Sequence, residues 1–242
     1  MVDDLLILER PETLTHAVAR SIGEAIVREV FVPGQALPEI PLAAQLGTSR
    51  GTVREALRLL ADQGLVEIVQ RRGGFVAELT PRKAREIFTL RAELEAFAVH
   101  LVFEQGGYPK ATMHELAAVL DDLGRAATEG DVFEVAELDM RFHDILSREC
   151  GHQVLLDLLA GLRTQMRRFI VYTKLVNSDV EPESVTHQRL LTAIRSEDAD
   201  QAATEVRRHI LAAGEQLLRK LTGGGNQLSC DGRVLAGNDG ET

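Results

Sequence analysis

Helical amphipathic periodicity extends through most of the 242-residue chain, and one strand-like stretch interrupts it. Residues 65–69 and 75–79 are rich in β-branched and aromatic side chains, and two glycines lie in the connection between them. This pattern predicts a β-hairpin with a basic tip. Before it, apolar spacing and turn residues predict helices over about 14–30, 41–46 and 50–63. This order of elements predicts a winged helix-turn-helix.

The remainder of the chain has no strand signal and predicts a second, all-helical domain. Thr80-Pro81 is the expected boundary, which gives domains over 1–79 and 80–222. The Gly-rich segment 223–242 has a composition typical of a disordered tail. Short breaks separate six expected helices, at about 82–105, 111–129, 131–149, 152–176, 182–196 and 199–221. We therefore expect a mainly α protein, with the winged domain followed by an antiparallel bundle of six or seven helices.

Composition narrows the functional classes. Apolar residues make up 45% and charged residues 26%, close to the average of soluble globular proteins. The two cysteines form no metal knuckle or disulfide framework, no apolar run is long enough to span a membrane, and the first residues are acidic. These features predict a cytoplasmic protein with no membrane partner. The net charge of −10 means that any contact with DNA must come from a local basic patch.

Such a patch is predicted at the start of the third helix and at the hairpin tip. A recognition helix inserts its N-terminal residues into the major groove, where Arg can bind guanine and hydroxyl groups can bind phosphate. The alternative is that these arginines are ordinary solvated charges. Five arginines on two elements that a winged fold places side by side favour DNA contact. The candidate residues are Ser49, Arg50, Thr52, Arg54, Arg58, Arg71, Arg72 and Gly73.

Four side chains in the second domain form a candidate metal site. Asp139 and His143 are four residues apart on one expected helix, so they share a face. His187 and His209 lie on two further helices of the same bundle. One Asp and three His make a ligand set for a divalent transition metal. Spacing alone leaves open the alternative that each histidine is a hydrogen-bonded core residue.

The N-terminal residues resemble the DNA-binding domain of GntR-family transcriptional regulators over about 14–79. The match is carried by Pro33-Gly34-x-x-Leu37-x-Glu39-x-x-Leu42-Ala43-x-x-Leu46-Gly47-x-Ser49-Arg50-x-x-Val53-Arg54-Glu55-Ala56-Leu57 and continues through Arg72-Gly73-Gly74-Phe75-Val76. In one departure, Pro41 stands where many relatives have a basic residue that contacts DNA. The resemblance implies a regulator, by default a repressor, that binds a palindromic double-stranded operator as a homodimer.

Residues 82–221 resemble the FCD ligand-binding domain of the FadR branch of that family. The matching pieces are Arg91-x-x-Leu94-Glu95, Leu138-Asp139-x-x-Phe142-His143, His187-x-x-Leu190 and Arg208-His209-Ile210. The resemblance implies that Asp139, His143, His187 and His209 hold an ion, often Zn or Ni, beside a cavity for a small organic acid. Arg91 is then the main candidate for binding the acid, and Arg141 a weaker one. An intrahelical pair with Glu95 is the alternative role for Arg91.

Two other functions remain open at this point. In the first, the same regulator has a purely structural metal and an effector that is not a carboxylate. In the second, the metal serves an enzyme, since a metal with open positions can activate water. The chain shows no HExxH motif, nucleophile motif or phosphate loop, so we do not expect catalysis.

Overall fold

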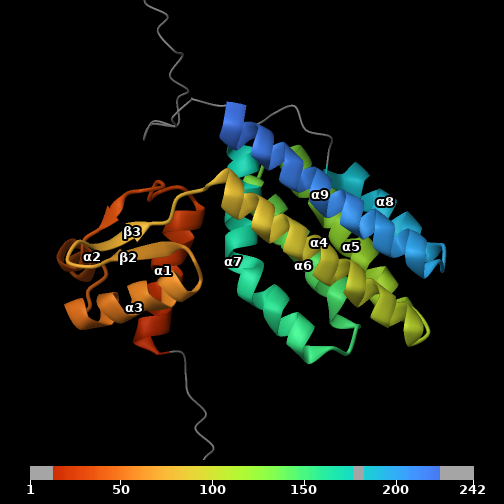
Figure 1. The fold of residues 1–242 in the computed structure, drawn as a ribbon, viewed down its shortest axis with the longest axis horizontal. Helices are drawn as coiled ribbons and strands as arrows, with labels where there is room; N and C mark the ends of the chain where they lie inside the picture. Colours follow the sequence, from red (N-terminus) through yellow and green to blue (C-terminus); the bar gives the residue numbers. More distant parts are fainter. Residues whose placement is uncertain (1–12, 177–182, 224–242) are drawn as a thin grey trace, which may run out of the picture. The chain divides into compact units, whose positions relative to one another are not determined.

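The computed structural model describes residues 13–176 and 183–223. The chain divides into two compact units between Glu78 and Leu79 (Figure 1). Both units are mainly helical, as the sequence predicts, and the first carries a small sheet. The tail expected over 223–242 lies outside the described residues, except for Gly223 at the end of the last helix.

The first unit is a winged helix-turn-helix. The elements of this unit in chain order are α1 (Leu14–Val27), β1 (Ala36–Leu37), α2 (Glu39–Gln45), α3 (Arg50–Asp62), β2 (Val66–Val69) and β3 (Gly73–Val76). Strand β3 lies between β1 and β2 in an antiparallel sheet, with Val66 opposite Val76 and Ala36 opposite Phe75. The three expected helices and the hairpin are present, although α1 ends at Val27 rather than at about 30. The second strand of the hairpin spans Gly73–Val76 rather than the expected 75–79, because Gly73 and Gly74 pair with Val69 and Ile68 instead of forming the connection. The short strand β1 was not predicted, because two residues are too few for a period to show.

Local sequence explains where α1 and α3 begin. The side chain of Thr13 caps α1, and that of Ser49 caps α3, each by accepting a backbone N–H of the first turn. Gly47 has a φ of +61° in the turn between α2 and α3, a left-handed conformation that glycine adopts without strain. The inner faces of α1 and α3 meet in an aliphatic core that includes Ile22 and Leu57.

The second unit is an all-helical bundle. Its helices agree closely with the six expected from sequence. They are α4 (Pro81–Glu104), α5 (Lys110–Glu129), α6 (Val132–Arg148), α7 (Gln153–Val176), α8 (Glu183–Arg195) and α9 (Ala199–Gly223). Helix α4 packs along α9 over much of its length, and α5 packs against both α6 and α8 (Figure 1).

Close packing of α4 on α9 depends on Gly214. A Cβ atom built at this position would lie 2.8 Å from the Cβ of Phe88, which is closer than real side chains approach. The glycine therefore lets α9 approach the α4 side chain directly. The bundle core around this contact is aliphatic, with Phe88, Phe142 and Phe169 as its buried aromatic residues among those described.

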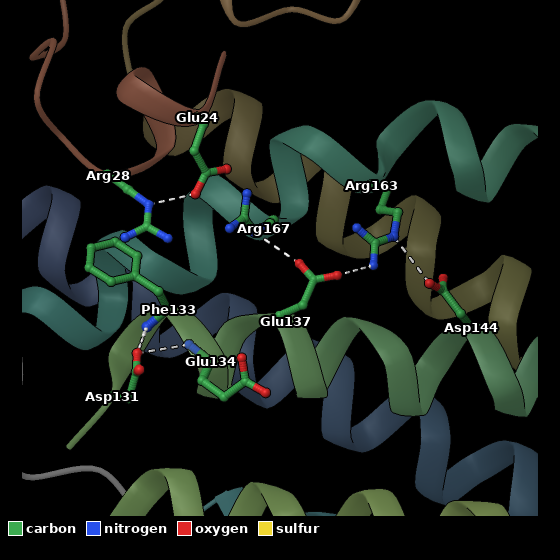
Figure 2. A network of polar contacts seen from close by, with 9 residues as sticks. All are labelled: Glu24, Arg28, Asp131, Phe133, Glu134, Glu137, Asp144, Arg163 and Arg167. Atoms are coloured by element: carbon green, nitrogen blue, oxygen red, sulfur yellow. Dashed lines mark hydrogen bonds and ion pairs between the residues drawn. The ribbon is translucent and has the colours of Figure 1, made fainter. Parts of the chain in front are cut away.

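Ion pairs join α6 to α7 at the edge of the bundle. Arg163 Nη2 lies 2.7 Å from one oxygen of Glu137, and Arg167 Nε lies 3.1 Å from the other (Figure 2). Arg163 Nε also lies 3.1 Å from Asp144. These pairs are partly exposed, so each contributes modestly to stability. These pairs hold α6 in place against α7, and α6 carries two of the candidate metal ligands.

Candidate functional site

The start of α3 presents the residues expected to contact DNA. The Oγ of Ser49 accepts the backbone N–H of Thr52 at 3.1 Å, and the two hydroxyl groups lie 2.8 Å apart. The side chains of Arg50 and Arg54 are 60% and 45% exposed, and both extend from the same face of the helix toward α2. The first turn of α3 thus combines hydroxyl and guanidinium groups at one accessible helix N-terminus.

Glu39 on α2 joins the two arginines. One of its oxygens accepts a hydrogen bond from Arg50 Nε at 2.6 Å, and Arg54 donates from Nε and Nη2, each at 2.8 Å. The hydrogen bonds from Arg54 and then Arg50 lower the pKa of Glu39 to about 2. The sequence places Glu39 in the family motif, but its contact with residues 11 and 15 positions later depends on how α2 packs on α3.

The remaining candidates lie along α3 and in the wing. Arg58 pairs with Glu55 at 2.6 Å on α3, with both side chains exposed. At the hairpin tip, Arg71 has a φ of +64° and Gly73 a φ of +91°. The guanidinium of Arg72 lies 5.1 Å from the ring centroid of Phe75, within cation–π range. The wing therefore holds its two arginines on a tight, exposed turn.

The four candidate metal ligands converge in the second unit. Asp139 and His143 on α6, His187 on α8 and His209 on α9 each offer a ligand atom, and these atoms all lie within 4.8 Å of one another. Asp139, His143 and His187 are buried. His187 Nε2 lies 3.2 Å from Asp139 Oδ1. Three separate helices thus bring one oxygen and three nitrogen donors to one place in the bundle.

The protonation of this cluster suits a cation. Burial raises the pKa of Asp139, but the hydrogen bond from His187 and the other basic side chains around it outweigh this and lower it. Burial and the neighbouring His187 and His143 hold the pKa of His209 well below its usual value. A carboxylate beside neutral imidazole is the form in which these side chains bind a metal.

The geometry also fits an ion. His143 Nε2 and Asp139 Oδ2 are buried and have no hydrogen-bond partner among the described residues. Ligand atoms about 2.0–2.2 Å from a common metal lie within about 4.4 Å of one another. The observed separations need only small side-chain shifts to reach this range. Three imidazoles and one carboxylate therefore form a donor set for a divalent transition metal.

Glu95 on α4 supports the cluster from behind. Its Oε2 lies 2.5 Å from His143 Nδ1, and its Oε1 accepts the Nε–H of Arg91 at 2.5 Å. Burial raises the pKa of Glu95, but the charge of Arg91 and the hydrogen bonds with His143 and Arg91 lower it overall, so it is a carboxylate. Because a carboxylate only accepts, His143 carries its proton on Nδ1 and directs Nε2 toward the other ligands.

A small cavity of about 40 Å³ adjoins the cluster. Asp139 and His209 line it together with Arg91, and Lys174 on α7 contributes a second basic side chain. Arg91 Nη2 is buried with no hydrogen-bond partner among the described residues. Arg91 thus both makes the pair with Glu95 and lines the cavity. Lys174 was not identified from sequence, because a lone lysine near a helix end has no distinguishing pattern.

Arg141 lies away from the cavity that adjoins the candidate metal ligands. Its side chain is 55% exposed on α6 and lies 3.7 Å from Glu115 on α5. It is not among the residues that line the cavity next to Asp139. The offset of two positions from Asp139 turns Arg141 away from the face that carries the metal ligands.

These features define a class of protein, namely a DNA-binding regulator with a separate sensing domain. Comparison with known families gives the particular assignment. The model of bacterial regulatory proteins of the gntR family matches residues 14–76, and the FCD domain model matches residues 86–212. The chain belongs to the GntR family of transcriptional regulators and carries an FCD domain. The family consists of transcription regulators rather than enzymes, as the sequence predicted.

Similar proteins agree with this assignment. The chain is 28% identical to the gluconate operon transcriptional repressor of Bacillus licheniformis, over 76% of each chain. It is 26% identical to the galactonate operon transcriptional repressor of Escherichia coli, over 86% of this chain and 98% of the relative. The fold matches that of E. coli McbR/YncC with a TM-score of 0.71 at 23% identity, covering 87% of this chain and 99% of the other.

The winged domain implies DNA binding, and the FCD domain implies that a small molecule is sensed. Within the described residues, no helix has both the length and the apolarity needed to cross a bilayer.

Proposed function

We propose that this protein is a cytoplasmic repressor of the FadR branch whose operator affinity depends on a small organic acid bound beside a metal ion. The observation that carries the proposal is the convergence of Asp139 and three histidines next to a cavity lined by Arg91 and Lys174. A divalent ion in this position supplies positive charge that attracts a carboxylate. Arg91 can then bind the acid through its buried guanidinium.

DNA recognition is assigned to the exposed side of α3 and to the tip of the wing. In this proposal, Arg50 and Arg54 contact base edges, while Ser49 and Thr52 bind phosphate. Arg58 continues the DNA-facing side of α3 beyond Arg50 and Arg54. The wing residues Arg71, Arg72 and Gly73 contact the neighbouring backbone or minor groove. The surface position of these side chains supports the assignment. Pro41 on α2 removes a basic contact that many relatives have, so the operator preference is expected to differ from theirs.

The protein is proposed to act as a homodimer on a palindromic operator, with half-sites about one helical turn apart. Helices α4 and α7, which pack together, support this. They carry exposed apolar side chains at Leu90, Phe97, Val154 and Leu158, with exposed fractions between 48% and 65%. Large apolar side chains exposed on two helices that pack together are typical of protein interfaces. Analytical ultracentrifugation tests the dimer directly.

Zn²⁺ and Ni²⁺ are the proposed ions, because imidazole-rich sites with one carboxylate suit them. His187→Ala removes a ligand that is fully buried between α6 and α9. We expect the variant to lose bound metal, measured by elemental analysis after dialysis. The control His100→Ala removes an imidazole near exposed Asp200, and it should keep full occupancy. Full occupancy in both variants would remove His187 from the site.

A thermal-shift screen tests the effector. The protein is screened with mono-, di- and tricarboxylates, once loaded with Zn²⁺ and once treated with a chelator. A ligand that binds the folded state raises the melting temperature. We expect a carboxylate hit that disappears on chelation and that changes the affinity for DNA. A metal that binds tightly with no carboxylate hit would instead favour the alternative of a structural metal with another effector.

A further inference from the structure

Glu95 connects the candidate metal ligand His143 to the candidate effector ligand Arg91. It lies on α4, outside the ligand set, and its side chain is only 3% exposed. Both of its oxygens are in use, one toward each partner at 2.5 Å. We propose that Glu95 is the positioning residue of the sensing site. It fixes the proton of His143 on Nδ1 and holds Arg91 at the cavity. This inference rests on the proposed metal site.

The position of the carboxylate accounts for the orientation of His143. The ring has two nitrogens, and only a nitrogen without a proton can bind a metal. Glu95 accepts from Nδ1, and this leaves the Nε2 lone pair directed at the cluster, where it has no hydrogen-bond partner among the described residues. Support of this kind from a second residue typically changes metal affinity about 10- to 100-fold.

The other carboxylate oxygen of Glu95, Oε1, holds Arg91 in position. Arg91 lies one turn before Glu95 on α4, and its side chain is 5% exposed. With Nε held by Glu95, Arg91 lines the cavity together with Asp139 and His209, and its buried Nη2 has no hydrogen-bond partner among the described residues. A single carboxylate therefore sets the positions of a metal ligand and of the cation proposed to bind the effector. The two sites share this one residue.

Glu95→Gln is the discriminating change, because an amide keeps the size of the side chain but retains only one acceptor oxygen. It can satisfy Arg91 or His143, and when its NH₂ faces Nδ1 it places the histidine proton on Nε2. We expect Zn²⁺ affinity, measured by competition with a chromophoric chelator, to fall about 10- to 100-fold. The visible absorption of the Co²⁺-loaded protein should also change, because a merely structural residue would not alter the ligand field.

Glu93→Gln is the matched control. Glu93 lies one half-turn away on the same helix, is exposed, and pairs with Arg207 on α9 at 2.8 Å. It should leave both the Zn²⁺ affinity and the Co²⁺ spectrum unchanged. If Glu95→Gln behaves like this control, the inference is wrong.

Glu95→Gln leaves the charge of Arg91 buried beside a neutral group, which can prevent the variant from folding. A second pair of variants tests the same inference without this buried, unpaired charge. Arg91→Met removes the charge of the arginine, and Arg91→Met with Glu95→Gln removes both charges. We expect the double variant to bind Zn²⁺ about 10- to 100-fold more weakly than Arg91→Met alone. Equal affinities would overturn the inference. If the wild-type protein and His187→Ala both fail to bind Zn²⁺ and Co²⁺, the proposed metal site itself fails, and this inference with it.

Discussion

The two units each hold an arginine–glutamate cluster, but the surroundings of the two clusters are opposite. In the winged unit, Glu39 joins Arg50 and Arg54 at the surface, where the arginine side chains are 60% and 45% exposed. In the bundle, Glu95 joins Arg91 and His143, and none of the three side chains is more than 5% exposed. In both places one carboxylate lies between two basic side chains, and the two clusters differ most in their exposure to solvent.

Water and salt weaken the exposed pairs, so the arginines of the winged unit can exchange Glu39 for a DNA group at little cost. The side chains of the buried cluster are shielded from bulk solvent, so a lost partner is costly to replace and its members stay in one arrangement. An adjustable cluster suits recognition of a large polyanion. A fixed cluster suits a site that must hold an ion and a small ligand at defined distances.

The largest expected difference is in folding stability. Glu95→Ala leaves the charge of Arg91 buried without its partner, which should lower the free energy of unfolding by about 3–5 kcal/mol. Glu39→Ala leaves two exposed arginines in water and should change stability far less. Urea denaturation of both variants measures the contrast. Similar losses from the two variants would mean that burial does not separate the clusters.

Arg54→Ala tests the exposed cluster as the DNA-reading one. We expect the affinity for a duplex selected by the wild-type protein from a random pool to fall about 10- to 100-fold, the usual effect of losing one arginine–base contact. Fluorescence anisotropy measures it. Arg82→Ala is the control, since Arg82 is an equally charged, exposed residue on α4. A decrease shared by both variants would indicate a general charge effect.

Ser49→Ala tests the N-terminus of α3, the helix that carries Arg50 and Arg54 of the exposed cluster. Loss of the cap on the N–H of Thr52 should destabilise the protein by about 0.5–2 kcal/mol. It should also weaken DNA binding beyond the effect on stability, because Ser49 is a proposed phosphate contact. Thermal melting and anisotropy measure the two effects. A variant with normal stability and normal DNA affinity would contradict the described cap.

The smallest expected effect is the pH dependence of Glu39. Its pKa is lowered from 4.5 to about 2, so its pairs stabilise the folded state above pH 4.5 and lose that contribution as the pH falls toward 2. The difference in melting temperature between wild type and Glu39→Gln should be constant from pH 7 to 5 and shrink below pH 4.5. A difference that grows on acidification would show that the pKa is raised instead.

The sequence alone predicted most of the architecture, because local rules govern it. Apolar periodicity predicted the helices of both units, and the glycine at position 47 predicted the tight turn before α3. Strand β1 was not predicted, because two residues are too few to show an alternating apolar pattern and its pairing with β3 is a long-range contact. The resemblance to a family supplied the grouping of Asp139 with three histidines, which spacing had left open.

Only the tertiary structure decided which charges meet. Glu39 contacts Arg54 across 15 positions, and Glu95 contacts His143 across 48, so no local pattern could reveal either pair. The sequence ranked Arg91 above Arg141 as an effector ligand, and the structure places Arg91 at the cavity and Arg141 at the surface. Helix formation follows from nearby residues, whereas the environment of a charge depends on which helices pack around it, and that is a property of the whole fold.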